Sequence, residues 1–353
     1  MDLYVLNRSF ELIDIIDSMD SIIWAERHVG SGDFELYAIA NDRIINSLQE
    51  GFYLNRIDRD VFMIIEDFNV TTDAELGNHI TVTGRCLKSI LSRRIVWRQT
   101  NLYGKVEMCI RRLIIENIIN PTDSKRKIPN FILGDIKGFT ETMEMQTSYD
   151  NLQDVIDQIC RTYGFGYRVT LNEQGQLVFD LYRGVDRSYN QTENPYVVFS
   201  NDFDNLLNSD YSYQTSNYKN VVLVGGEGEG LDRKLQEVGN ASGLDRYEMY
   251  DDNRHMSTND GAITDAEYYA QMTESGHESL SEHQKVESFS GGVNYQKPYE
   301  YGVDYQLGDV VQVINEYGMA ASATIAEVIE SEDGEGYKSI PTFEYKGGSE
   351  TWQ

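Results

Sequence analysis

The sequence is poor in cysteine and has neither a leader segment nor a long apolar run. Cys86, Cys109 and Cys160 are too few and too widely spaced for a disulfide framework or a zinc site. Their odd number, and an N-terminus without the pattern of a signal peptide, favour synthesis in a reducing host cytoplasm. No apolar stretch approaches the roughly 20 residues that a membrane helix needs, so stable membrane association is not expected.

Positive charge is also scarce. The 353 residues include 30 Lys and Arg against 58 Asp and Glu, which gives a formal net charge of −28. A chain this acidic repels phosphates, which argues against a nucleic acid or an anionic membrane as its main partner. The hydrophobic content of 40% is that of a folded protein, and the length allows two or three separate cores.

The few basic residues are concentrated in one segment. Residues 85–127 carry eleven Lys and Arg against three acids, whereas residues 227–282 carry fourteen acids against four bases. This separation favours contacts between copies of the chain, or between its domains. The candidate oligomer contacts are Arg93, Arg94, Arg98, Arg111 and Arg112. The alternative is a helix with a basic face that is simply solvated.

Motifs of catalytic and cofactor sites are missing. There is no GxSxG motif, and the GxGxG stretch that ends at Gly230 lacks the spacing of a dinucleotide loop and contains two glutamates. His277 and His283 lie six residues apart, about 240° around a helix, and so cannot share a metal. We therefore expect no catalytic residue, no cofactor and no metal site. A carboxylate pair acting on a glycan stays open, because 58 acids always place some pair at a plausible separation.

The hydrophobic pattern predicts a mainly β protein in three domains. Residues 1–99 contain six short alternating stretches, typical of a small antiparallel barrel or sandwich. Residues 100–190 show a helical period from Val106 to Ile118 and again over 151–164, followed by a hairpin, which indicates an α+β domain. Residues 191–353 return to strands, interrupted at about 260–287 by a helix with the capping box Thr264–Glu267. The expected fold is two β-barrel-like domains that flank a mixed α/β unit.

Residues 184–230 combine short apolar strands with tyrosine-rich polar segments. This composition is typical of a wet protein–protein interface and equally of an ordinary sheet surface. The phrases GVDRS, ENPYVVFS, FDNLL and NYKNVVLVGGEGEG in this stretch resemble those of the siphovirus tail-hub proteins of the gene-product-37-like family. The phrases IIWAERHVGSGDFELYA, NLYGKVEMCIRRLI and YQLGDVVQVINEYG extend the resemblance over nearly the whole chain.

The resemblance implies a structural, non-enzymatic baseplate hub at the tail tip of a virion, with two tube-type barrel domains. Such a hub is expected to form a homotrimeric ring that caps or continues the tail tube. Its expected partners are the distal tail protein, the tape-measure protein and receptor-binding or other baseplate proteins, while DNA only passes through the channel. The alternative functions are a carbohydrate-binding module, which the 24 tyrosines favour, and a cell-wall glycan hydrolase.

Overall fold

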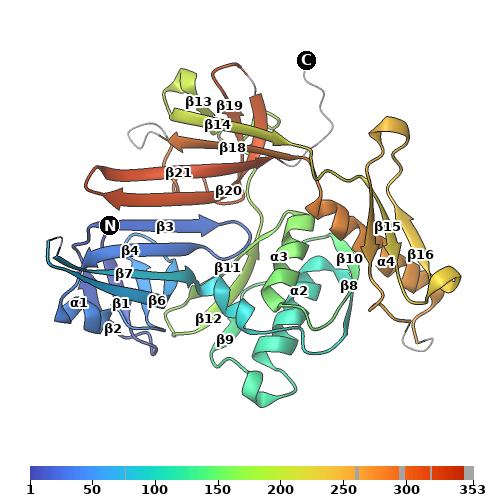
Figure 1. Ribbon diagram of the computed structural model, residues 1–353, viewed down its shortest axis with the longest axis horizontal. Coiled ribbons are helices and arrows are strands. Elements are labelled where there is room, and N and C mark those ends of the chain that lie inside the picture. Colours follow the sequence, from blue (N-terminus) through green and yellow to red (C-terminus); the bar gives the residue numbers. More distant parts are fainter. Residues whose placement is uncertain (76, 259–261, 294–298, 319, 346–353) are drawn as a thin grey trace.

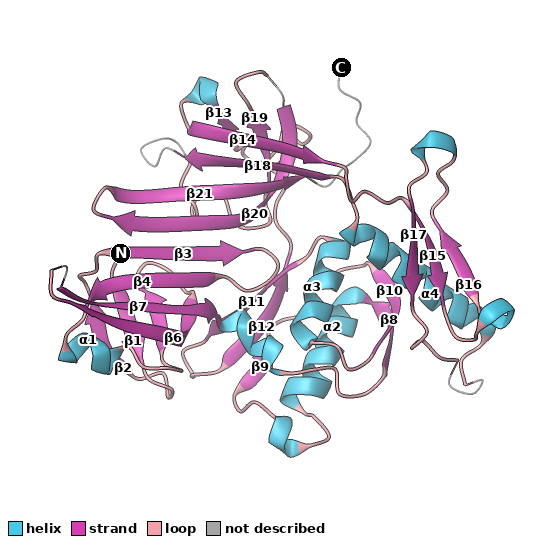
Figure 2. Cartoon of the chain, in the orientation of Figure 1, coloured by secondary structure: helices cyan, strands magenta, loops and turns pink. Residues whose placement is uncertain are grey.

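The protein is described by a computed structural model over residues 1–75, 77–258, 262–293, 299–318 and 320–345. Strands make up most of the regular structure, and the longer helices gather on one side of the molecule (Figure 2). The mainly β class that the alternating pattern predicted is confirmed.

One sheet of 13 strands runs through both the N-terminal and the C-terminal parts of the chain (Figure 1). In path order its strands are β14 (Leu206–Gln214), β18 (Val286–Val293), β21 (Gly336–Tyr345), β20 (Ala320–Asp333), β3 (Ser21–Arg27), β4 (Asp33–Ile39), β7 (Gly77–Cys86), β6 (Phe62–Asp73), β5 (Tyr53–Arg56), β1 (Leu3–Leu6) and β2 (Leu12–Ile16). β19 (Val310–Ile314) branches from β20 and carries β13 (Val198–Ser200). The helix α1 (Asp42–Ser47) lies between β4 and β5 in the chain.

The two halves of this sheet meet where β3 pairs with β20. The strands run antiparallel, with Trp24 opposite Glu330 and Ile22 opposite Glu332. In this pairing the backbone N–H and C=O groups along the facing edges of β3 and β20 bond one another. Neither half of the sheet therefore has to close into a barrel to satisfy these edge groups. The predicted closure into two separate barrels is therefore wrong: over the described strands the sheet is open, with β2 and β14 at its ends.

A mixed α/β unit packs beside the large sheet. The predicted helical period is confirmed in α2 (Val106–Ile114), which continues as a π-helical turn (Ile115–Ile119), and in α3 (Leu152–Tyr163). The backbone of Gly164 is left-handed, with φ 70°, and ends α3 as glycine commonly does. Two small sheets complete the unit: β8 (Thr100–Lys105) with β10 (Thr142–Thr147), and β12 (Leu177–Tyr182) between β11 (Gly166–Leu171) and β9 (Phe131–Leu133).

A small sheet and α4 (Asp265–Glu282) form a third region at one edge of the molecule (Figure 1). The predicted capping box is present, because the side chains of Thr264 and Glu267 each bond the other's backbone N–H. The sheet has β15 (Val221–Gly225) between β16 (Leu235–Val238) and β17 (Glu248–Asp252). Its residues Val222 and Val224 pack against Tyr268 and Met272 of α4. The strand pattern did not indicate this separate sheet.

Short 3-10 turns connect several of these elements. They span Leu87–Arg93, Ser124–Arg126, Asn201–Phe203, Gly230–Asp232 and Gly243–Asp245.

Candidate functional site

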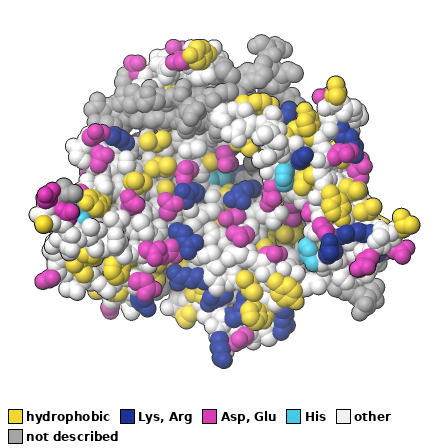
Figure 3. Space-filling view, in the orientation of Figure 1, with side chains coloured by type: hydrophobic (Ala, Val, Ile, Leu, Met, Phe, Trp, Pro, Cys, Tyr) yellow, Lys and Arg dark blue, Asp and Glu magenta, His cyan; other side chains and the backbone are white. Residues whose placement is uncertain are grey.

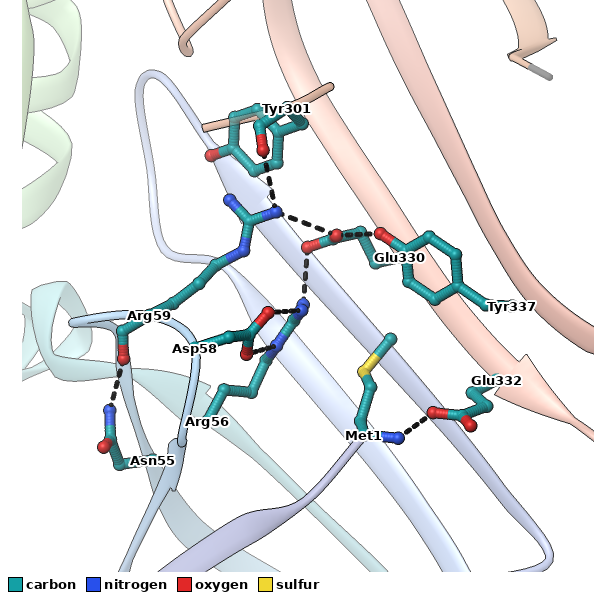
Figure 4. Close-up of polar contacts among 9 residues, drawn as sticks. All are labelled: Met1, Asn55, Arg56, Asp58, Arg59, Tyr301, Glu330, Glu332 and Tyr337. Atoms are coloured by element: carbon teal, nitrogen blue, oxygen red, sulfur yellow. Dashed lines mark hydrogen bonds and ion pairs between the residues drawn. The ribbon is translucent and has the colours of Figure 1, made fainter. Parts of the chain in front are cut away.

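A buried group of charged side chains joins the two halves of the large sheet (Figure 4). The carboxylate of Glu330, on β20, is 1% exposed and accepts hydrogen bonds from Arg56 at 2.6 Å and from Arg59 at 3.0 Å. Tyr337, on β21, donates its hydroxyl to the same carboxylate. Arg59 also lies 4.2 Å from the centre of the Tyr301 ring. One carboxylate thus links segments from both ends of the chain.

The charges of this junction balance one another. Asp58 accepts two hydrogen bonds from Arg56, at 2.9 and 2.6 Å, so that two carboxylates face two guanidinium groups. Burial raises the pKa of the nearby Glu26 carboxyl, which accepts a hydrogen bond from a tyrosine hydroxyl at 3.0 Å. Asp58 itself is largely exposed, but this balance spares the buried Arg56 and Glu330 the large cost of an unpaired buried charge.

A second junction ties the mixed unit to the large sheet. Lys88 follows β7 and donates to the carbonyls of Arg27 and His28, at 2.6 and 3.2 Å. Its ammonium lies 4.8 Å from the centre of the Tyr167 ring, and burial lowers its pKa. Tyr167, on β11, donates to Asp157 of α3 at 2.6 Å. The end of β3, the start of the mixed unit and α3 are therefore held in one arrangement.

The five candidate contact arginines lie in or beside the mixed unit, in different surroundings. Arg94 and Arg111 each donate to a backbone carbonyl of their own chain at 2.8 Å. Arg112 is half-exposed and pairs at 2.7 Å with an acid one turn further along the helix. Arg93 and Arg98 are exposed and form no salt bridge with any described residue. Arg112 also donates to the backbone carbonyl of Asn101 at 2.8 Å. Of the five, Arg93 and Arg98 therefore have the guanidinium groups most open to a partner.

Exposed apolar side chains accompany these arginines. Tyr103 is 82% exposed, and Trp97, Met108 and Ile115 are also exposed. In Figure 3, apolar and basic side chains lie together over this lower part of the molecule. Aromatic residues and arginine are enriched in protein interfaces. We call this area the basic surface, made of Trp97, Arg98, Tyr103, Met108, Arg112 and Ile115.

The carboxyl of Glu278, on α4, is buried without a counter-charge. The residue is 5% exposed, and one of its carboxyl oxygens has no hydrogen-bond partner among the described residues. Burial, together with the nearby carboxylates Glu274, Glu282 and Asp251, raises its pKa to about 8. A raised pKa is one mark of a catalytic acid, but this carboxyl is closed off from any substrate.

Neither a metal cluster nor a membrane helix occurs in the part of the chain that the structure describes. No three His, Cys, Asp or Glu side chains converge there so as to hold an ion. No helix within that part combines the length and the apolar character that crossing a membrane requires.

Sequence reasoning pointed to the basic surface and missed the ion-paired junction. Arg56 ends the short strand β5, and Asp58 and Arg59 follow it in a polar turn, so their charges look like those of any turn. Glu330 shares the inward face of β20 with the fully buried Val328. A charged residue at an inward position of an alternating strand is the one signal that could have found this site.

Comparison with solved structures identifies similar folds over nearly the whole chain. No curated protein matches the sequence. The fold is similar to the 43 kDa tail protein of prophage MuSo2 from Shewanella oneidensis, with a TM-score of 0.60 and 14% identity over 97% of this chain and 98% of that one. It is also similar to the tail protein from Neisseria meningitidis MC58, with a TM-score of 0.59 and 13% identity over 98% of this chain and 96% of that one.

A third similar structure is the prophage tail protein gp18 from Listeria monocytogenes EGD-e. The TM-score is 0.56 at 13% identity, over 99% of this chain and 96% of that chain. Residues 2–343 match the family model of the siphovirus ReqiPepy6 Gp37-like protein. The chain therefore belongs to the siphovirus ReqiPepy6 Gp37-like family of phage tail proteins.

Proposed function

We propose that this protein is the baseplate hub at the tail tip, and that three copies form a ring that caps or continues the tail tube. Its role is structural: it attaches the distal tail protein, the tape-measure protein and receptor-binding or other baseplate proteins. Membership of a phage tail protein family over residues 2–343 is the observation that carries this proposal.

The open ends of the large sheet support assembly into a ring. Within the described residues, β2 and β14 each have a neighbouring strand on one side only. An open strand edge tends to pair with another chain unless it is covered. On β2, Leu12 and Ile13 are exposed, although Arg43 covers one point of the edge by donating to the Ile15 carbonyl at 2.7 Å. Copies arranged about a rotation axis would cover such edges.

The proposed arrangement keeps the three-domain division. Residues 1–99 and 191–353 supply the strands of the large sheet that would surround the tube, and residues 100–190 lie beside them. DNA would pass through the channel without binding, because a chain with a net charge of −28 repels phosphates. A channel wall lined with Lys and Arg in the assembled ring would overturn this part.

The test is the mass of the purified protein in solution by light scattering, at low and at moderate salt. A ring of three gives about 120 kDa, three times the 40.4 kDa of the chain. The double variant Arg98→Glu/Arg112→Glu should lower this mass, because both arginines are exposed on the basic surface. Lys338→Glu is the matched control, since Lys338 is exposed on β21, inside the sheet and away from the basic surface and the open strand edges. A wild-type protein that stays at 40.4 kDa at all concentrations and salts contradicts self-assembly.

The rival glycan hydrolase has less support. It requires two carboxyl groups facing an open cleft, one of them with a raised pKa. Glu278, on α4, has the raised pKa but is only 5% exposed. Binding of the purified protein to peptidoglycan, with and without release of soluble sugars, separates the hub from both the hydrolase and a carbohydrate-binding module.

A further inference from the structure

The sequence GLDR occurs twice in the third region, at 230–233 and 243–246, and both copies fold into the same kind of 3-10 turn. The glycine of each copy has a positive φ, 58° and 64°, which glycine adopts readily. The leucine that follows points into solvent: Leu231 is 105% exposed and Leu244 is 97% exposed. A single exposed leucine is ordinary on a protein surface. The same sequence, turn and exposure occurring twice on one small sheet indicates a shared role.

Both turns are tied to the sheet by their arginines. Arg233 forms an ion pair with Asp252 of β17 and donates to a backbone carbonyl at the end of β15. Arg246 pairs with Glu237 of β16 at 3.1 Å and also with Glu248 of β17. These pairs hold the backbone of each turn against the sheet, so the turn that carries each leucine is already formed before binding. A turn whose backbone is already formed loses less entropy on binding.

The two leucines frame an apolar sheet face. The turns precede and follow β16, so Leu231 and Leu244 lie at opposite ends of that strand. Between them, on the side of the sheet away from α4, Leu223, Leu235 and Tyr250 are partly exposed. Figure 3 shows apolar side chains over this edge of the molecule with acidic and basic ones around them. We call this the GLDR face, made of Leu223, Leu231, Leu235, Leu244 and Tyr250.

Charge defines what can cover this face. Its two arginines, together with the neighbouring Arg254, are already paired with the three carboxylates of Glu237, Glu248 and Asp252. The aspartates of the two GLDR turns add further negative charge at its rim. A complementary surface must therefore be apolar and carry basic side chains that are available for pairing.

The chain itself offers such a surface. The basic surface combines Trp97, Tyr103, Met108 and Ile115, all exposed, with an arginine free of salt bridges in the described chain, Arg98. Tyr103 is 82% exposed, so the protein's own third region does not cover it. The two surfaces match in apolar character and are opposite in charge.

We propose that the GLDR face docks on the basic surface of a second copy of this chain. The contact joins two different surfaces, and such a head-to-tail contact closes into a ring when its rotation allows. This inference rests on the proposed self-assembly and names the contact that produces it. Added salt weakens the contact, because its rim is electrostatic.

The first test is the double variant Leu231→Ala/Leu244→Ala. Because both side chains lie in solvent in the single chain, its thermal unfolding should equal that of the wild type under conditions that keep both monomeric. Its mass by light scattering should fall from about 120 kDa toward the 40.4 kDa of one chain. Val303→Ala is the matched control, since Val303 is 71% exposed and lies outside the GLDR face.

The second test detects the contact directly. Leu244→Cys and Tyr103→Cys are made in separate chains that carry different tags, and the two proteins are mixed under mild oxidation. Since Cys86, Cys109 and Cys160 are buried, a disulfide between the two tags reports the new cysteines. We expect this heterodimer to form, and we expect none when Val303→Cys replaces Leu244→Cys.

The outcomes separate the two proposals. A ring of about 120 kDa that survives Leu231→Ala/Leu244→Ala and gives no cross-link overturns the GLDR contact and leaves the hub function standing. A wild-type protein that is always monomeric and gives no cross-link overturns both self-assembly and this contact.

Discussion

Replacing Glu330 by glutamine tests whether the buried ion pairs hold the two halves of the protein together. Glutamine keeps the shape of the side chain and removes its charge. Arg56 would then keep its ion pair with Asp58, while Arg59 would lose its ion pair with Glu330, and the junction would contain an excess positive charge. Removing one partner of a buried ion pair costs about 3–5 kcal/mol.

The lower end of that range applies to this site. Arg56 is 3% exposed but keeps both hydrogen bonds to Asp58, and Arg59 is 16% exposed and can turn partly toward water. We therefore expect Glu330→Gln to lower the free energy of unfolding by about 3 kcal/mol. For a chain of this length that corresponds to a fall in Tm of about 4 °C.

The control lies two residues along the same strand. Glu332 pairs with the N-terminal ammonium, but its side chain is 41% exposed, so Glu332→Gln should cost less than about 1 kcal/mol. Urea unfolding gives the two free energies, and hydrogen exchange shows whether the amides of β3 and β20 lose protection in Glu330→Gln alone. Equal effects of the two substitutions would refute the claim that this junction is a main support of the fold.

Three further substitutions test local features of the structure. Glu278→Gln should raise the free energy of unfolding by about 3 kcal/mol at pH 7, measured by urea unfolding, because burial raises the pKa of this carboxyl to about 8. The stability that the protonated Glu278 carboxyl contributes is fully present below its unfolded pKa of about 4.5 and is lost as the pH rises to about 8. The free energy of unfolding of the wild type should therefore fall more steeply from pH 5 to pH 8 than that of the variant. Parallel profiles of this free energy against pH would contradict a Glu278 carboxyl that stays protonated in the folded protein. Gly308→Ala should lower Tm more than Gly318→Ala does. Both glycines have positive φ, 87° and 75°, but only at Gly308 would the added methyl carbon meet the ring of His28. Equal falls in Tm would show that the His28 ring moves away and relieves the clash. Thr264→Ala removes the side-chain cap of α4 and should cost about 1 kcal/mol, with faster hydrogen exchange confined to the first turn of that helix.

The helices were predictable because their signals are local. The apolar positions from Val106 to Ile118 are spaced for one helical face, and the structure buries them. Gly164 ends α3, and the capping box begins α4. Each of these features depends on residues within one or two turns of one another, so neighbouring residues in the sequence carry the full information.

The candidate contact surface was predictable only in part. Counting charges along the chain indicated the basic segment, but not that Arg94 and Arg111 donate to carbonyls of their own chain. The sequence also does not distinguish the exposed Leu231 and Leu244 from leucines that the fold buries. Whether a polar or apolar side chain faces solvent depends on what packs behind it, and that is a property of the folded chain.

Period-two alternation and helical spacing were enough to assign most strands and helices, because the apolar residues of a strand or helix repeat at a fixed spacing within a few residues. The pairing of β3 with β20, which makes one open sheet where two barrels were expected, could not be read in this way. Backbone hydrogen bonds carry no residue code, so a strand near residue 24 and a strand near residue 330 show no mark of being partners. The same holds for Glu330 and its arginines, which meet only because that pairing brings them together.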